Sequence, residues 1–283
     1  MLYILVPVFN RIQSTERFLA SLKRQSYKDY KVVIINDGST DNTELYLNNY
    51  YPEVKIVKGN GNLFWGGAIN LGLDYIEGLL SEDDILAFAN NDIEFEEYTI
   101  ENILHYYLDN KNAAYHPVTV NKDWICESSG SIVINWIFFI SRHPYRNNTY
   151  RSIKGSKPES VDFATARFLL FNPEVLKYVN RIDTKNFPHY GGDNDFSISL
   201  KKHEILTYVI PSSVCILDTT TTGNNPKVIK NISSFIESLS SIKSTNNLRV
   251  RFAIGKKHCP KKYLLFYYIS VLLQIVILNI RKK

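Results

Sequence analysis

Residues 85–95 read ILAFANNDIEF, an apolar run that ends abruptly in amides and carboxylates. Five consecutive apolar residues, Ile85 to Ala89, are typical of a strand that is buried on both faces of a sheet. In open sheets of parallel strands, ligands bind just beyond the carboxyl ends of the strands. The polar residues from Asn90 to Glu94 are therefore predicted to lie at a ligand-binding edge.

Three further apolar runs precede this one, and amphipathic segments separate them. The runs are LYILVPV (2–8), KVVIIND (31–37) and VKIV (54–57). Strands that are apolar along their length and alternate with helices predict an α/β fold, with a mostly parallel central sheet and helices on both faces. Residues 113–222 are less regular, with short β-type pieces such as SIVINWIFFI, and residues 226–283 have a helical pattern.

The chain has 283 residues, 45% of them hydrophobic, which suffices for one large domain with an appendage. Its net charge of +5 is unevenly distributed, because residues 226–283 hold twelve Lys/Arg and one acid while residues 1–225 are net acidic. This asymmetry predicts a body at 1–225 and a basic helical extension at 226–283. Three widely spaced cysteines predict neither a zinc site nor a disulfide framework, which suits a reducing cytosol.

Polar residues also end the first two predicted strands, at 7–11 and 36–41. In a parallel sheet these segments and residues 90–94 converge on one edge. Asp92 and Glu94, two residues apart on an extended chain, can face the same side and offer oxygen ligands to Mg²⁺ or Mn²⁺. The alternative is a simple polar strand exit, in which Asn caps a turn and Asp caps the next helix.

Two glycine-containing segments complete the polar set. FPHYGGDNDF (187–196) contains Asp193 and Asp195, of which one is predicted to cap the following helix and the other to be available as a general base. GNGNLFWGGAIN (59–70) lacks the GxGxxG spacing of dinucleotide-binding loops and follows the third strand, so NAD binding is not expected. Its Trp65 either covers a sugar or base or packs in the core.

Taken in order, five segments closely resemble glycosyltransferase family 2, the inverting enzymes of the GT-A fold. They are VPVFNR (6–11), INDGSTDNT (35–43), GNLFWGGAINLGL (61–73), NND (90–92) and FPHYGGDNDFS (187–197). The resemblance covers residues 2–222 and is strongest to the bacterial rhamnosyltransferase and cell-surface polysaccharide branches. It implies a GT-A domain at 1–225, and transfer of a sugar from a nucleoside diphosphate to a saccharide hydroxyl with inversion.

The resemblance also implies a donor site at the strand ends. The residues expected at the nucleotide or donor are Pro7, Phe9, Arg11, Asp37, Trp65, Gly67, Asn70, Asn91 and Asp92. Asp37 is expected to accept a hydrogen bond from the base of a UDP- or dTDP-sugar. Asp92 is expected to bind Mn²⁺ or Mg²⁺, with Glu94 as a second ligand or sugar contact. Many relatives have a metal-binding His where this chain has VCILD (214–218), so Asp218 is expected as an oxygen ligand in its place.

The catalytic base of the family maps to Asp193, which is expected to take the proton of the acceptor hydroxyl as that hydroxyl attacks the anomeric carbon. Gly192 replaces the acid that precedes the base in many relatives. The residues expected around the acceptor or donor sugar are Arg167, His189, Tyr190, Gly192 and Asp195. For His189, packing within its loop is an alternative role.

The last apolar stretch, YLLFYYISVLLQIVILNI (263–280), is 18 residues long and lies between basic residues. This length is near the lower limit for crossing a bilayer, and its few polar residues share a helical face. We expect an interfacial helix on an anionic membrane, hence a cytoplasmic protein bound peripherally to the inner face of the plasma membrane, with a lipid-linked acceptor. A single span, a homodimer contact and docking on the protein's own core are the alternatives.

Two other functions stay open from the sequence. A nucleotidyltransferase that makes nucleotide sugars would share the sheet and the metal site, but it should carry a Gly-rich basic loop where this chain has PVFNRIQS (7–14). A non-catalytic nucleotide-sugar-binding protein at the membrane would not need both Asp92 and Asp193. Only the pI of about 8.9 suggests nucleic acid, and the acidic body argues against that partner.

Overall fold

The computed structural model describes residues 1–218, 232–242, 244 and 246–280. Its strands are β1 (Leu2–Val8), β2 (Tyr30–Asn36), β3 (Lys55–Lys58), β4 (Ile85–Ala89), β5 (Ile93–Phe95), β6 (Ala113–Val120), β7 (Cys126–Ser128), β8 (Ile132–Asn135), β9 (Ile140–Arg142), β10 (Glu159–Val161), β11 (Phe168–Phe171) and β12 (Leu206–Leu217). Its helices are α1 (Ile12–Lys23), α2 (Thr43–Tyr50), α3 (Phe64–Ile76), α4 (Thr99–Asp109), α5 (Tyr150–Ile153), η1 (Pro173–Lys177), α6 (Gly192–Lys202), α7 (Ile232–Ser240), α8 (Leu248–His258), η2 (Lys261–Tyr263) and α9 (Leu264–Ile280).

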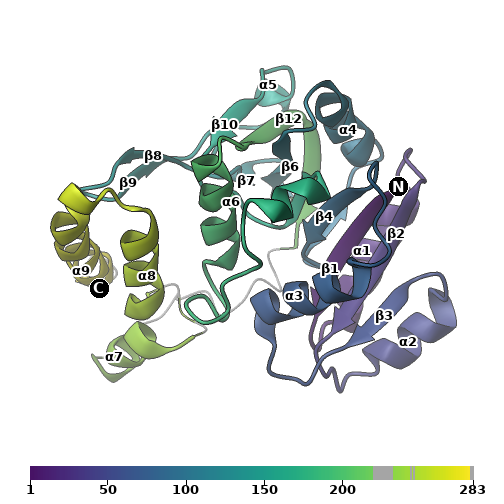
Figure 1. The fold of residues 1–283 in the computed structure, drawn as a ribbon, viewed down its shortest axis with the longest axis horizontal. Coiled ribbons are helices and arrows are strands. Elements are labelled where there is room, and N and C mark those ends of the chain that lie inside the picture. Colours follow the sequence, from purple (N-terminus) through teal and green to yellow (C-terminus); the bar gives the residue numbers. More distant parts are fainter. Residues whose placement is uncertain (219–231, 243, 245, 281–283) are drawn as a thin grey trace.

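A ten-stranded sheet forms the centre of the molecule (Figure 1). Its main path runs β10-β12-β6-β11-β4-β1-β2-β3, with β5 paired to β12 and β7 paired to β6. The four strands predicted from the apolar runs lie next to one another as β4-β1-β2-β3, and all three of their pairings are parallel. The predicted α/β fold is therefore confirmed.

Two hydrophobic clusters lie on opposite faces of this sheet, and β1 contributes to both. Tyr3 and Leu5 belong to the cluster under α3 and α6, whereas Leu2, Ile4 and Val6 belong to the cluster under α1, α2 and α4. Successive side chains of a strand point to opposite faces, so an unbroken apolar run is what a sheet covered on both faces requires.

The half of the sheet built from residues 113–217 is mixed in direction. β11 lies between β4 and β6 and is antiparallel to both, while β6 and β12 are parallel. The outer edge of β12 pairs with β10 through residues 207–209 and with β5 through residues 215–217. The parallel arrangement expected from the sequence thus holds for β1–β4, and the later strands add antiparallel pairs.

The C-terminal helices lie at the end of the molecule opposite β2 and β3 (Figure 1). α8 packs against α6, and α9 packs against α8 and the β8–β9 hairpin. Tyr267 of α9 contacts the rings of Trp136 and Phe139, at centroid distances of 6.1 and 5.1 Å. Residues 226–231 and 281–283, at the ends of the predicted extension, lie outside the described residues. Within the ranges described, no helix combines the length and apolarity needed to cross a membrane.

Candidate active site

The strand ends that were predicted to converge do lie together at the carboxyl edge of β1, β2 and β4. Val8 at the end of β1 is level with Asn36 at the end of β2, and Leu5 is level with Phe88 of β4. Hydrogen bonds tie the first two loops to each other: Ser39 Oγ accepts from the Asn10 backbone at 2.9 Å, and the Asn10 side chain accepts from the Thr40 backbone at 2.6 Å. The loops therefore form one preorganised rim.

Asp37, the acid expected to contact the nucleobase of the donor, holds the loop of residues 59–64, which is the third loop of this rim. Its Oδ1 accepts from the Gly61 backbone at 2.8 Å, and its Oδ2 accepts from Leu63 at 2.9 Å and Phe64 at 3.1 Å. The carboxylate is buried and sits at the start of α3. A carboxylate has about four lone-pair positions, so three backbone donors leave capacity for one further donor.

Asp92 is buried at the end of the NND segment, and its Oδ1 has no hydrogen-bond partner among the described residues. Burial raises the pKa of Asp92, and the positive charges of Arg167 and Arg11 oppose that rise. A buried carboxylate oxygen without a donor is costly unless a cation or a ligand satisfies it. Asp92 thus offers one buried carboxylate oxygen that a ligand could satisfy.

Glu94 and Asp218 lie beside Asp92, and Arg17 of α1 binds both of them. The Asp218 backbone donates to the Asp92 carbonyl at 2.8 Å, which places the two residues side by side. Arg17 forms an ion pair with Asp218, and its Nε is 3.6 Å from Glu94 Oε1. Among the residues described, no group of three His, Cys, Asp or Glu side chains is arranged to hold a metal ion. Glu94 and Asp218 are therefore close to Asp92 but share an arginine.

The two asparagines of the NND segment fix its position. The Asn91 side chain donates to Thr15 Oγ1 at 2.8 Å and so attaches the segment to α1. Asn90 Oδ1 accepts from Trp65 Nε1 at 2.9 Å, which ties the segment to the start of α3. Trp65 packs against the core, as one of the two alternatives predicted, and its indole also links two parts of the rim. Contact with a sugar or base stays a prediction.

Asn70 and Gly67 of α3 also have structural contacts. Asn70 forms two hydrogen bonds with the Ile182 backbone, at 2.9 and 3.0 Å, and thereby holds the chain that leads to the 187–196 loop. Gly67 packs closely on Leu63, whose Cβ lies 3.1 Å from the position of an added side chain. At the outer rim, Phe9 is exposed and Pro7 is partly buried. The donor contacts expected of these residues stay predictions.

Asp193 lies in the first turn of α6, at the same rim. The backbone N–H groups of Asn194 and Ala166 donate to its carboxylate, the former at 2.9 Å. Burial raises the pKa of Asp193, and the nearby positive charge of Arg167 opposes the rise. Arg167 acts in the same way on Asp92, so one guanidinium lies within electrostatic reach of both acids.

Gly192 has a steric reason for lacking the acid expected from the family pattern. A Cβ at this position would lie 2.9 Å from Ile182 Cγ2 and 3.3 Å from the Trp65 ring. Any side chain would therefore force Ile182 to shift and would crowd the indole that is bonded to Asn90. The aromatic residues of the preceding loop pack together, since the His189 ring lies 4.6 Å from Tyr190 and 5.7 Å from Phe64 between centroids.

Asp195, which was expected near the sugars, faces the C-terminal helices instead. Its Oδ2 is 2.7 Å from Lys257 Nζ, and its Oδ1 is 2.7 Å from His258 Nε2. Residues i and i+2 of a helix point roughly 200° apart, so Asp193 and Asp195 cannot both face one cavity. Only on an extended strand would the i, i+2 spacing place two acids on the same side.

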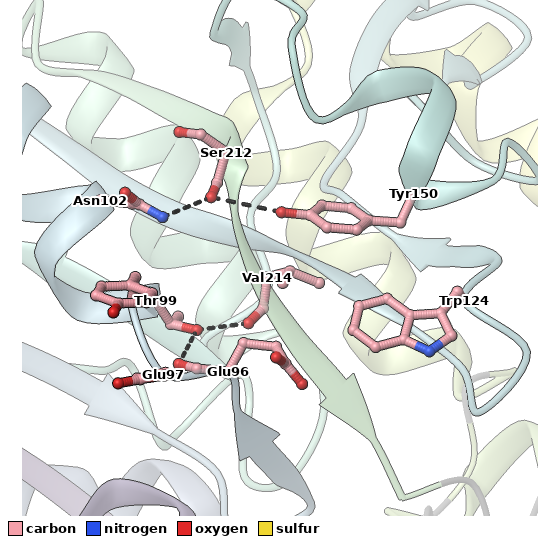
Figure 2. Close-up of a pocket in the computed structure, with 9 residues that line it drawn as sticks. Glu96, Glu97, Thr99, Asn102, Trp124, Tyr150, Ser212 and Val214 are labelled. Carbon is pink, nitrogen blue, oxygen red and sulfur yellow. Dashed lines mark hydrogen bonds between the residues drawn. The ribbon is translucent and has the colours of Figure 1, made fainter. Parts of the chain in front are cut away.

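A cavity of about 250 Å³ lies elsewhere, at the outer edge of β12 between its pairings with β10 and β5 (Figure 2). There, the Ser212 carbonyl accepts from Asn102 at 2.8 Å and the Val214 carbonyl accepts from Thr99 at 2.7 Å, as Figure 2 shows. Trp124 and Tyr150 line one side of the cavity. No predicted site residue lines it, so it is a gap in the sheet edge and not part of the rim.

The sequence did not predict the residues of α1 and α8 that bind the predicted site residues Glu94, Asn91 and Asp195. Arg17 and Thr15 belong to α1, and Lys257 and His258 to α8. A signal for the first pair exists, because α1 begins at the carboxyl edge and polar residues in its first two turns must lie beside that edge. The α8 contacts are separated from Asp195 by more than sixty residues and have no local signal.

This arrangement of sheet and rim matches solved proteins of the GT-A fold. The crystal structure of GalNAc-T7 with UDP, GalNAc and Mn²⁺ is similar with a TM-score of 0.62 at 10% identity, over 95% of this chain and 54% of that chain. The crystal structure of Staphylococcus aureus TarS residues 1–349 is similar with a TM-score of 0.56 at 14% identity, over 95% of this chain and 71% of that chain. At these identities the likeness establishes the fold alone, and the predicted GT-A fold is confirmed.

The family model described as Glycosyl transferase family 2 matches residues 3–178, and the chain belongs to this family. A glycosyltransferase of Rickettsia prowazekii is 33% identical over 114 residues, 38% of this chain and 33% of that protein. The N-acetylglucosaminyl-diphospho-decaprenol L-rhamnosyltransferase of Mycobacterium tuberculosis is 30% identical over 95 residues, 31% of each chain. The matches thus span about a third of these relatives' length. Chondroitin synthase of Pasteurella multocida is 36% identical over 89 residues, 29% of this chain and 9% of that protein.

Proposed function

We propose that this protein is an inverting glycosyltransferase that moves a sugar from a UDP- or dTDP-sugar to a saccharide hydroxyl. The observation that carries the proposal is that one short segment connects the two acids, because the Asn90 backbone, two residues before Asp92, donates to the Arg167 carbonyl at 3.0 Å and the Ala166 backbone donates to the Asp193 carboxylate. One acid has a carboxylate oxygen with no donor among the residues that the structure describes, and the other is anchored by backbone amides at the start of a helix. These are the environments of a residue that holds a cation and of one that holds a proton.

On the donor side, Asp92 would hold a Mn²⁺ or Mg²⁺ ion together with the diphosphate. Such ions are commonly bound through one or two carboxylates and the substrate's own phosphates, which suits the single unsatisfied oxygen of Asp92. When bound, the ion supplies positive charge against the charge that develops on the leaving diphosphate. Glu94 and Asp218 could add ligands only by exchanging Arg17 for the ion.

Residues of the chain itself supply the remaining electrostatics of the donor site. Arg11 and Arg167 lie near Asp92 and would attract the diphosphate through their fixed positive charges. Asp37 holds the 59–64 loop in place, and its remaining acceptor capacity suits an N–H of a pyrimidine base.

On the acceptor side, Asp193 would take the proton of the attacking hydroxyl. Burial raises the pKa of Asp193, which makes it a stronger proton acceptor than an exposed Asp. The hydrogen bonds from Asn194 and Ala166 fix the carboxylate, so the proton is taken at a defined place. Attack from the Asp193 side, opposite the leaving diphosphate, inverts the anomeric carbon.

A lipid-linked saccharide is the acceptor class we propose, in bacterial surface polysaccharide synthesis. The name of the mycobacterial relative specifies a decaprenol-linked acceptor, and the name of the Pasteurella relative specifies a polysaccharide. We extend the first of these chemistries to this chain as a proposal, because its C-terminal surface suits a membrane.

The membrane-facing surface that we propose consists of exposed apolar residues on α9 and on the β8–β9 hairpin. On α9 the residues lie on one stripe and are 45 to 68% exposed: Leu265, Phe266, Ile269, Leu272 and Leu273. Ile134, Phe138 and Ile140 of the hairpin are also exposed, and Gln274 donates to the Phe138 carbonyl at 2.6 Å. With Lys261 and Lys262 beside it, this surface suits peripheral binding to an anionic cytoplasmic leaflet.

The experiment that tests the function is a thermal-shift screen with UDP-, dTDP- and GDP-sugars in the presence of Mn²⁺, followed by product analysis. A UDP- or dTDP-sugar should raise the Tm, because it binds the folded state alone. Release of nucleoside diphosphate upon transfer, abolished by EDTA and restored by Mn²⁺ or Mg²⁺, supports the proposal. Absence of any shift, or release of pyrophosphate as expected of a nucleotidyltransferase, contradicts it.

A further inference from the structure

We propose that Asp195 is a positioning residue for catalysis, and that α8 holds the base Asp193 in place through it. The inference rests on the proposed function of Asp193. It assigns the C-terminal helices a role in the chemistry itself, beyond any contact with a membrane.

The contact at the centre of this proposal is an ionic cluster around the buried carboxylate of Asp195. The carboxylate of Asp195 is 6% exposed, and its two oxygens bind Lys257 Nζ and His258 Nε2, each at 2.7 Å. Burial lowers the pKa of His258, so its imidazole is neutral near pH 7 and its Nε2–H donates to Asp195. The cluster therefore pairs one buried negative charge with one positive charge and one neutral donor. Breaking such a cluster is costly because it leaves an uncompensated charge.

Asp195 transmits this anchoring to Asp193 through the first turn of α6. The Asp195 backbone N–H donates to the Gly191 carbonyl at 2.8 Å, which closes the first helical turn around Asp193. Gly191 has a φ of +86°, a backbone conformation that only glycine adopts without strain. A shift of Asp195 therefore moves the backbone that carries the base.

α8 also contacts the loop of residues 183–191, which leads into this turn. Lys257 Nζ lies 3.3 Å from Asp183 Oδ2, and Arg249 Nη2 donates to the Lys185 carbonyl at 2.7 Å. Val250 packs on Gly191, with its Cγ1 3.1 Å from the position of an added Cβ. From the other side, α3 holds the loop through Asn70 and Ile182. The base is thus carried by a segment fixed between α3 and α8.

The test compares Asp195→Asn, Lys257→Met and the double variant with the wild type. A loss of positional accuracy of about 1 Å costs on the order of 100-fold in rate, so we expect Asp195→Asn to lower kcat by about 10- to 100-fold. The donor KM should change by less than about twofold, because the residues that bind the donor are untouched. Lys257→Met should lower kcat less, and the double variant should be no slower than Asp195→Asn, since both changes break one cluster.

The matched control is Lys201→Met on the same helix. Lys201 forms an ion pair with the buried Asp162 and not with the 183–191 loop that leads to Asp193. The loss of Lys201 should therefore lower the Tm without lowering kcat. Equal losses of kcat in Lys201→Met and Asp195→Asn would show a general stability effect and overturn the proposal. So would a kcat within about twofold of wild type in Asp195→Asn, or additive effects in the double variant.

Two arrangements keep the outcome interpretable. If Asp195→Asn does not fold, Lys257→Met retains the His258 contact and carries the same test with a smaller expected loss. Wild-type transfer that is absent in Asp193→Asn establishes the function on which the inference rests. A failure of the proposed function therefore appears in the wild type, whereas a failure of this inference appears only in the Asp195 and Lys257 variants.

Discussion

Asp193 and Asp195 stand two residues apart in one helical turn, yet Asp193 is held by backbone amides at the rim while Asp195 binds α8. The divergence follows from the helix, in which residues i and i+2 lie on opposite sides. Asp92 and Glu94 have the same spacing at the start of the short strand β5, and both lie close to Asp218, Asp92 through a backbone hydrogen bond and Glu94 through Arg17. The meaning of an acidic pair in a sequence therefore depends on the element that carries it.

Gly192 should not tolerate the acid that many relatives have before the base. Gly192→Asp would push its side chain into Ile182 and the Trp65 ring, and overpacking of this kind costs about 1–3 kcal/mol. Urea denaturation should show this loss of unfolding free energy. Gly155→Asp is the control, since an added Cβ at Gly155 meets nothing within 4 Å. Equal stability of the two variants would contradict the packing described for Gly192.

Asp37→Asn should both destabilise the fold and weaken nucleotide binding. An amide offers one oxygen where the carboxylate accepts from Gly61, Leu63 and Phe64, so at least one partly buried N–H loses its acceptor at a cost of about 1 kcal/mol. Calorimetric titration with UDP and dTDP in the presence of Mn²⁺ should show weaker binding. The exposed Asp83→Asn is the control and should change neither quantity. Unchanged binding in Asp37→Asn would remove Asp37 from the donor site.

His116 should make the fold sensitive to acid. Burial lowers the pKa of His116 from 6.5 to about 4, so between these pH values the unfolded chain binds a proton that the folded chain does not. Stability therefore falls as the pH is lowered from 6.5 to 4, by about 3 kcal/mol for this group. Urea midpoints measured across this range should depend less on pH in His116→Gln than in the wild type. The exposed His105→Gln serves as control, and an identical slope in all three proteins would contradict the prediction.

Removal of the apolar stripe on α9 should weaken membrane binding. Replacing Leu265, Ile269 and Leu272 together by Ser removes exposed apolar surface worth about 25 cal/mol per Å², enough for a loss of at least 10-fold in affinity. Cosedimentation with vesicles of phosphatidylcholine and phosphatidylglycerol measures the change. Leu45→Ser with Leu108→Ser, exposed leucines on α2 and α4, is the control. Equal binding by both variants would contradict the proposed membrane-facing surface.

The sequence was most informative where local pattern and tertiary environment agree. The runs at β1, β2, β3 and β4 are apolar because both faces are covered, so their direction and their polar ends could be predicted. The antiparallel insertion of β11 depends on how a long irregular segment returns to the sheet, which periodicity does not encode. The segment 131–140, expected as one β-type piece, turns back as the β8–β9 hairpin and packs on α9.

In the candidate site, too, some residues could be predicted from the local sequence and others depend on partners that are distant in the chain. The location of Asp92 and Asp193 could be predicted because polar residues follow β4 and precede α6, and the family resemblance supplied their expected roles, which stay predictions. The roles of Asn70, Asn91 and Trp65 could not, because their partners Ile182, Thr15 and Asn90 lie far along the chain. For these residues the structure shows contacts that fix the rim, and direct contact with the donor stays a prediction.

The most direct measurement of the central claim is single-turnover sugar transfer by Asp193→Asn beside its affinity for UDP or dTDP with Mn²⁺. If Asp193 takes the acceptor proton and Asp92 holds the cation of the donor, the variant should lose transfer by at least about 100-fold, the usual contribution of a general base, while the nucleotide binds within about twofold of the wild type. Transfer near the wild-type rate would contradict the account, and so would a parallel loss of nucleotide affinity.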